Sequence, residues 1–158
     1  MTDTEDRERF PVRRNPRLKG FDYSSPNWYF VTICTWEKQC LFGSPKQLSP
    51  LGEIARQCLN EIGMHFPCVT VEKSVIMPNH VHAIISLTEG VNLSAVVGLL
   101  KSAVTKQVHE IRPGEKVWQT SFHDHIIRSR TDFERIWLYI DNNPGRWMDD
   151  CFYTPDQE

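Results

Sequence analysis

The chain has 158 residues, 40% of them hydrophobic and 24% charged, with a formal net charge of −2. This length and composition indicate one globular domain that buries most of its unfolded surface. No apolar stretch approaches the ~20 residues that cross a bilayer, which argues against a membrane-spanning protein. The five cysteines form no Cys-x-x-Cys pair and the first nine residues contain no apolar signal core, so we expect a cytoplasmic protein with reduced thiols.

Charge is distributed unevenly along the chain. Between Arg7 and Lys19 six basic residues stand against one acid, whereas residues 149–158 carry four acids and no base. We therefore expect a basic N-terminal arm over residues 1–20, a folded domain over residues 21–148 and an acidic tail over residues 149–158. Such an arm can provide a binding surface for nucleic acid in a protein of near-neutral total charge. A solvated arm without a partner would carry the same charges.

The first predicted elements are a strand and a helix. Residues 28–35 are rich in β-branched and aromatic side chains, which is typical of a buried strand. A helix is predicted from Pro50 to about Ile62, because apolar residues recur there at helical spacing. Ser49 provides its N-cap, proline suits its first turn, and Pro67 closes the segment.

Three further elements follow in the same way. Residues 69–77 and 80–87 predict two strands, and the Pro78–Asn79 turn between them indicates an antiparallel pair. A second helix is predicted from about Leu93 to Ile111, with its apolar residues on one stripe. The last strand is predicted within residues 118–128, and residues 122–127 are its clearest part.

The order strand, helix, strand, strand, helix, strand predicts an α+β, ferredoxin-like (split βαβ) fold, in which two helices cover one face of an antiparallel sheet. One extra C-terminal helix follows, and we expect it to carry Tyr139. Thr131 and Glu134 predict a capping box at its start. Pro144 disfavours the helical conformation of the residue before it, so the helix is predicted to end at Asn143.

His80 and His82 are the most informative pair in the sequence. Alternate side chains of a strand share a face, so both imidazoles project side by side while Val81 points the other way. Two imidazoles in this arrangement can grip one divalent metal ion. A His-x-His pattern also occurs often by chance, so the interpretation depends on residues further along the chain.

Tyr139 and Asn143 lie one turn apart on the extra helix and share a face. Two neutral imidazoles and an amide oxygen can hold a divalent cation and leave positions open for water and a phosphodiester. A tyrosine one turn before the amide would lie close to that phosphodiester and could attack it covalently. The alternative is a half-buried tyrosine at the edge of the packing stripe of the helix.

Several blocks in fixed order resemble a known family. They are residues 77–82 (Met-Pro-Asn-His-Val-His), Trp118–Gln119, residues 125–128 (His-Ile-Ile-Arg) and residues 139–144 (Tyr-Ile-Asp-Asn-Asn-Pro). The chain is similar in these blocks to the HUH single-tyrosine transposases of the IS200-like group, above all to the REP-associated tyrosine transposases. The resemblance covers residues 13–147.

The resemblance implies a metal-dependent transposase, a single-strand DNA endonuclease that nicks and rejoins hairpin (REP-like) DNA through a 5′-phosphotyrosine. It implies Mg²⁺ or Mn²⁺ as cofactor, with His80, His82 and Asn143 as metal ligands and Tyr139 as catalytic nucleophile. Single-stranded or hairpin DNA is the expected partner, and the protein would be a monomer or a homodimer. A hairpin-DNA-binding repressor or architectural factor that does not cleave is the alternative on the same fold.

DNA contacts are expected from basic, aromatic and imidazole side chains. Phosphate contacts would come mainly from the basic arm, and His125 belongs to the block shared with the family. Trp118 is the best candidate among the tryptophans for stacking on a base. The full set of expected DNA-binding residues is Arg13, Arg14, Arg17, Lys19, Lys101, Trp118, His125 and Arg128.

Overall fold

The computed structural model describes residues 27–88 and 90–149. The predicted basic arm, residues 1–20, lies outside these ranges, as does the predicted acidic tail beyond its first residue. Within the described ranges, no helix has the length and apolar character needed to cross a membrane.

Four strands form one antiparallel sheet with the spatial order β2-β3-β1-β4. This order confirms the predicted ferredoxin-like arrangement. The strands are β1 (Asn27–Cys34), β2 (Val69–Met77), β3 (His80–Leu87) and β4 (His123–Ile127). The helices are α2 (Pro50–His65), α3 (Leu93–Ile111) and α4 (Arg130–Asn142), and two short 3-10 segments are η1 (Trp36–Lys38) and η2 (Pro144–Asp149).

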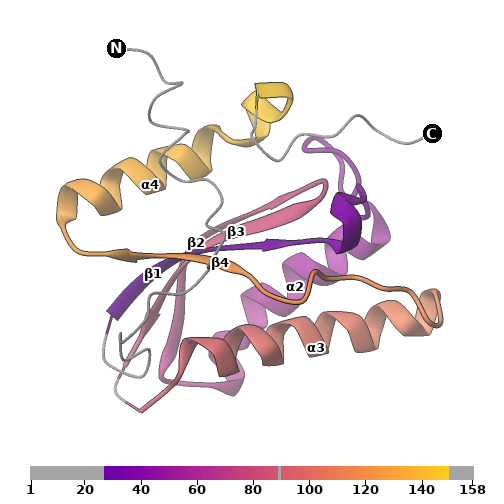
Figure 1. Ribbon diagram of the computed structural model, residues 1–158, viewed down its shortest axis with the longest axis horizontal. Coiled ribbons are helices and arrows are strands. Elements are labelled where there is room, and N and C mark those ends of the chain that lie inside the picture. Colours follow the sequence, from indigo (N-terminus) through magenta and orange to yellow (C-terminus); the bar gives the residue numbers. More distant parts are fainter. Residues whose placement is uncertain (1–26, 89, 150–158) are drawn as a thin grey trace.

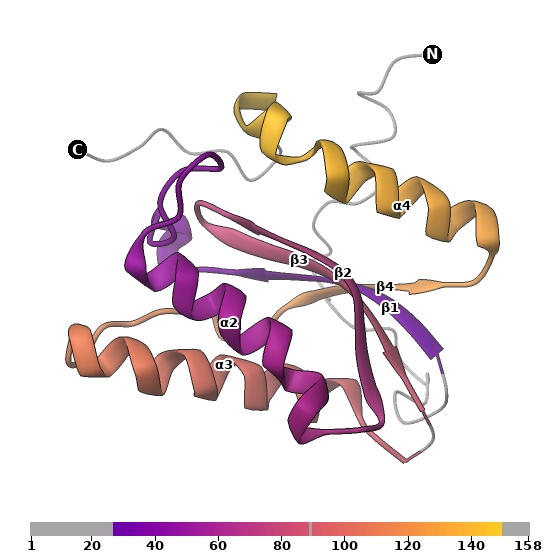
Figure 2. The ribbon, with the colours of Figure 1, turned by 180° about the vertical axis from the view of Figure 1, so that it is seen from behind.

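Helices α2 and α3 cover one face of the sheet, and α4 lies on the opposite face (Figures 1 and 2). Both faces of β1 are therefore buried. Tyr29, Val31 and Ile33 pack towards α2 and α3, in the larger hydrophobic core. Phe30 packs towards α4, in a second cluster with Ile84, Ile127, Ile136 and Ile140. This burial on two sides explains why β1 is a nearly continuous apolar run and shows no polar alternation.

The first helix begins as the sequence predicts. The Ser49 hydroxyl accepts a hydrogen bond from the Gly52 backbone N–H at 3.1 Å, and Pro50 is the first helical residue. Gly52 is required by close packing, because a Cβ at this position would lie 2.4 Å from the carbonyl oxygen of Phe42. The loop before α2 is thereby held tightly against the helix.

The start of α4 differs from the prediction, whereas its end is confirmed. Its N-cap is Ser129, whose hydroxyl accepts from the Asp132 backbone N–H at 3.0 Å, so the predicted capping box of Thr131 and Glu134 is wrong. Strand β4 ends at Ile127 and the helix already begins at Arg130. Ser129 is therefore the residue that caps the free N–H groups of the first turn, and Thr131 lies inside the helix. At the other end Asn143 keeps helical dihedrals (φ −59°, ψ −46°). The α-helix ends at Asn142 with Asn143 as its C-cap, as Pro144 predicts, but Asn143 itself stays helical because the chain continues into the 3-10 segment η2.

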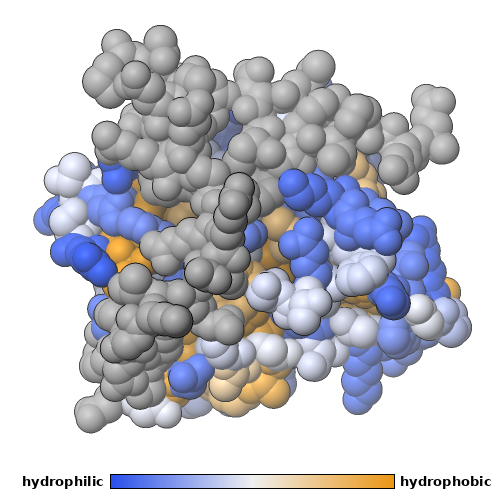
Figure 3. Space-filling model, viewed as in Figure 1, coloured by the Kyte–Doolittle hydropathy of each residue, from blue (hydrophilic) through white to orange (hydrophobic). Residues whose placement is uncertain are grey.

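The space-filling view shows the face of the molecule seen in Figure 1 (Figure 3). Hydrophobic surface is visible there among the hydrophilic residues. Two large hydrophobic side chains are exposed among the described residues of β1 and α4: Trp28 is 43% exposed and Leu138 is 59% exposed. Exposed apolar side chains that cluster into one patch often mark a binding surface.

Candidate active site

His80 and His82 open strand β3 on the face that α4 covers. Both side chains are fully buried. Their Nε2 atoms face each other at 3.1 Å, and their ring centroids are 4.5 Å apart. The predicted same-face arrangement of the two imidazoles is therefore present in the strand.

Each imidazole is oriented by a hydrogen bond on its other nitrogen. His80 Nδ1 lies 2.7 Å from Asn79 Oδ1, and His82 Nδ1 lies 2.9 Å from the Thr32 hydroxyl. An amide oxygen can only accept, so His80 Nδ1 donates and its Nε2 presents a lone pair. The Thr32 hydroxyl can accept or donate, so His82 Nε2 can carry a proton towards His80 or present a second lone pair to a cation.

Burial keeps both histidines neutral. Desolvation, and then electrostatic repulsion from the second imidazole, hold the pKa of His80 well below its usual value, and the side chain of Asn143 opposes this lowering only in part. Desolvation lowers the pKa of His82 to about 3. Neutral imidazole is the form that binds a metal ion.

Helix α4 brings Asn143 and Tyr139 to the two histidines. Asn143 is 4% exposed, and its Oδ1 is buried without a well-formed hydrogen bond to any described residue. The Asn143 side chain acts on the pKa of His80, which it raises against the larger effect of burial. The ring of Tyr139 is half-buried, with its centroid 5.4 Å from that of His82 and 6.0 Å from that of Phe30.

The donor set fits a divalent cation. Adjacent ligands of an octahedral ion with bonds of about 2.1 Å are about 3 Å apart, and the two Nε2 atoms are separated by 3.1 Å. No three His, Cys, Asp or Glu side chains within residues 27–88 and 90–149 gather into a possible metal site. The third donor that this corner offers is the amide oxygen of Asn143, the buried polar atom described above.

The other predicted site residues lie elsewhere. Lys101 on α3 donates to the Gln119 carbonyl at 2.6 Å, and the Trp118 indole donates to the Lys101 carbonyl at 3.2 Å. Both residues therefore lie in the layer of α2 and α3, away from His80 and His82, where Trp118 packs against the larger core. Four predicted contacts, Arg13, Arg14, Arg17 and Lys19, lie outside the described residues.

His125 and Arg128 lie on the same side of the sheet as α4. His125 Nε2 is 2.6 Å from Asp132 Oδ2, and Arg135 donates to the other carboxylate oxygen at 2.8 Å. Burial alone would raise the pKa of Asp132, but the hydrogen bonds from His125 and Arg135 outweigh it and lower the pKa. His125 thus ties β4 to α4, and Arg128 is exposed just beyond the strand.

Several residues around the site were not predicted. Thr32 orients His82, and Trp147 of η2 covers His80 with a ring-centroid distance of 6.1 Å. Asn79 adjoins the His-x-His pair, so its polar side chain was a visible signal. No sequence signal points to Thr32, because its place opposite His82 is set by the register between β1 and β3.

Comparison with known proteins places this geometry in a family. The family model described as transposase IS200 like matches residues 27–143, which contain all four residues of the candidate site. The chain belongs to the IS200-like transposase family. The predicted resemblance to these transposases is confirmed, and the site described above is that of a family member.

Two proteins of Haemophilus influenzae are similar in sequence to this transposase. One, described as uncharacterized, is 35% identical over 168 residues, which span 90% of this chain and 93% of the relative. The other is named as a REP-associated tyrosine transposase and is 27% identical over 134 residues, 78% of this chain and 73% of the relative.

Two solved structures share the fold of this transposase. A REP-associated tyrosine transposase bound to a REP hairpin superposes with a TM-score of 0.60 and 22% identity, over 82% of this chain and 73% of that chain. A transposase from Deinococcus radiodurans superposes with a TM-score of 0.56 and 19% identity, over 80% of this chain and 97% of that chain. These likenesses confirm the α+β fold.

Proposed function

We propose that this IS200-like transposase nicks and rejoins single-stranded DNA, with Tyr139 as nucleophile and Mg²⁺ or Mn²⁺ held by His80, His82 and Asn143. The observation that carries the proposal is the convergence of two chain segments. Nε2 atoms 3.1 Å apart on β3 lie beside the Tyr139 ring, 5.4 Å from His82, and beside a buried amide oxygen without a partner among the described residues.

The protein side chains prepare the site for a phosphodiester. Asn79 and Thr32 hold the imidazoles so that their Nε2 atoms converge, as outer partners of metal ligands do. Burial keeps both imidazoles neutral and able to bind a cation. The bound cation would neutralise phosphate oxygens and stabilise the leaving 3′-oxygen.

Tyr139 supplies the attacking group. Its hydroxyl, with a free pKa near 10, is a weak nucleophile at neutral pH. As the tyrosine oxygen forms a bond to phosphorus, the bond from phosphorus to the 3′-oxygen breaks, and the 3′-oxygen ends as a hydroxyl that takes up the proton. The 5′-phosphotyrosine conserves the phosphodiester for rejoining, because the 3′-hydroxyl of a strand can reverse the step.

We further propose hairpin-bearing DNA as the substrate. The solved structure of a REP-associated tyrosine transposase with a REP hairpin supports DNA of this kind as a partner for the fold. The predicted arm residues and the exposed Arg128 would provide phosphate contacts. A hairpin-binding protein without cleavage would use the same surface and leave Tyr139 chemically idle.

The test is a denaturing gel with a hairpin oligonucleotide that carries a label at its 3′ end. The wild type with Mg²⁺ or Mn²⁺ should give a slower protein–DNA band, and chelation of the metal should remove it. Tyr139→Phe should bind the hairpin and give no such band. Tyr153→Phe is the matched control and should behave as the wild type. A covalent band with Tyr139→Phe, or none with the wild type, would contradict the proposal.

A further inference from the structure

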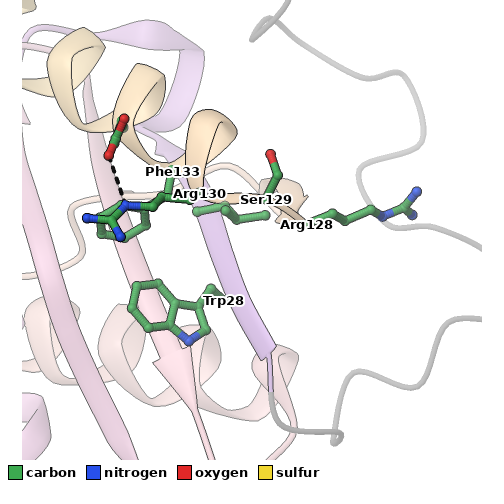
Figure 4. A pocket seen from close by; sticks show the side chains of 7 residues that line it. Trp28, Arg128, Ser129, Arg130 and Phe133 are labelled. Carbon is green, nitrogen blue, oxygen red and sulfur yellow. Dashed lines mark hydrogen bonds and ion pairs between the residues drawn. The ribbon is translucent and has the colours of Figure 1, made fainter.

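A second site lies at the start of α4. A cavity of about 500 Å³ opens there between β1, the end of β4 and the first turn of the helix (Figure 4). Trp28 and Phe133 form its aromatic walls, and Arg128 and Arg130 flank it. This volume lies within the usual range for small-ligand pockets.

The aromatic walls of the cavity contact each other, and the indole is accessible. Trp28 is 43% exposed, which is unusual for the largest apolar side chain of a strand. Phe133 contacts it edge to face, with ring centroids 4.8 Å apart and planes at 72°. One face of the indole is therefore held in place and open to the cavity, as a stacking platform requires.

The rim of the cavity carries positive charge. Arg130 pairs with Glu134 at 3.1 Å, which compensates the one carboxylate that lines the cavity. Arg128 makes no hydrogen bond or ion pair with the rest of the described chain, and it extends outward from the rim (Figure 4). An exposed aromatic face beside a guanidinium that has no partner among the described residues complements a ligand that has both a flat base and a phosphate.

The cavity lies within reach of the candidate active site. Trp28 is four residues before Thr32 on the same face of β1, a distance of about 13 Å along the strand. Phe133 is six residues before Tyr139, a distance of about 9 Å along the helix. A DNA strand with one phosphate at Tyr139 can therefore continue along α4 and place a neighbouring nucleotide in the cavity.

We propose that this cavity binds one unpaired nucleotide of the DNA strand that runs past Tyr139. The base stacks on the indole of Trp28, and Arg128 contacts a phosphate of the same strand. The path of the DNA strand in this inference, from Tyr139 to the cavity, rests on the proposed function. The stacking itself requires no cleavage, so it can be measured separately.

The experiment uses the full chain with Tyr139→Phe, so that binding is measured without cleavage. Fluorescence anisotropy compares a labelled short oligothymidylate with an abasic strand of the same length. Trp28→Ala should weaken binding of the oligothymidylate by about 5-fold to 150-fold, the usual range for one lost stacking contact. Binding of the abasic strand should not change, and Trp28→Phe should keep most of the affinity.

Arg128→Ala should weaken binding of both strands equally and make the slope of log affinity against log salt shallower by about 0.7. Leu99→Ala is the control, because Leu99 is 48% exposed on α3, in the other layer; it should bind both strands as the parent does. Thermal melting verifies that each variant folds. Equal losses of Trp28→Ala on both strands would mean that the indole acts through packing and would overturn the proposal, as would unchanged binding of the oligothymidylate.

Cleavage by the Tyr139-containing protein is scored separately. If the wild type forms the covalent band while Trp28→Ala binds the oligothymidylate normally, the nucleotide site is refuted and the proposed function stands. If the wild type forms no band while the loss with Trp28→Ala is confined to the strand with bases, the nucleotide site stands and the cleavage proposal is refuted.

Discussion

Replacement of Thr32 by valine removes one hydroxyl from beneath the candidate metal site and nearly preserves the shape of the side chain. Thr32 is 3% exposed, and its hydroxyl is the 2.9 Å partner of His82 Nδ1. In the variant His82 Nδ1 is fully buried beside a methyl group. The imidazole then loses the bond that directs its Nε2 towards His80.

The expected effect follows from this geometry. Removal of an outer partner of a metal-binding histidine usually lowers metal affinity by about 10-fold to 100-fold. At about 1.4 kcal/mol per tenfold, this range corresponds to about 1.4–2.8 kcal/mol. The cost of leaving a buried donor or acceptor unpaired is also about 1–3 kcal/mol, so the free energy of unfolding should fall by a similar amount.

Isothermal titration with Mn²⁺ and urea unfolding of the full chain measure both effects. Thr32→Ser keeps the hydroxyl and should retain most of the metal affinity. Thr105→Val is the matched control, because it deletes a threonine hydroxyl that donates to the Lys101 carbonyl on α3, in the layer opposite the candidate site. Wild-type affinity for Mn²⁺ in Thr32→Val would refute the role of Thr32 in orienting His82.

The remaining predictions concern the metal ligands and the ends of α4. A double variant, His80→Ala with His82→Ala, should lose Mg²⁺-dependent nicking by orders of magnitude yet still fold, and nicking at the wild-type rate would exclude these ligands. Because the pKa of Asp132 is lowered in the folded state, its contribution to stability is present above the unfolded pKa of about 3.9 and is lost as pH falls through the folded pKa. Asp132→Asn should therefore reduce the free energy of unfolding at pH 7 by about 1.5–3 kcal/mol and flatten its fall below about pH 4. Urea unfolding of the wild type and the variant at several pH values measures this, and an equally steep fall at low pH in the variant would contradict the prediction. Ser129→Ala should destabilise the protein by about 0.5–2 kcal/mol through the lost N-cap, whereas Thr131→Ala should not if Ser129 is the cap.

Local chemistry accounts for the parts that sequence reasoning predicted correctly. Ser49 caps α2 because its side chain accepts a hydrogen bond from an N–H group of the first helical turn. This local interaction does not depend on where the helix packs. His80 and His82 share a face because the side-chain period of a strand is two. The order of elements restricts the topology to few choices, so the ferredoxin-like sheet could be predicted before any contact was known.

Contacts between distant segments account for what the sequence could not predict. Thr32 lies opposite His82 only through the register of β1 and β3, and Trp28 meets Phe133 only because α4 crosses the second face of the sheet. The cap of α4 was misplaced by two residues because the end of β4, which sets it, depends on pairing with β1.

The sequence by itself determined that two imidazoles share one strand face and that a tyrosine and an amide share one helix face, because both periodicities are properties of the backbone. Only the tertiary structure decided that these two faces meet. Burial by α4 makes the imidazoles neutral and leaves Asn143 Oδ1 without a hydrogen-bond partner in the described chain. Desolvation and convergence arise from packing between elements, and no spacing within one element encodes them.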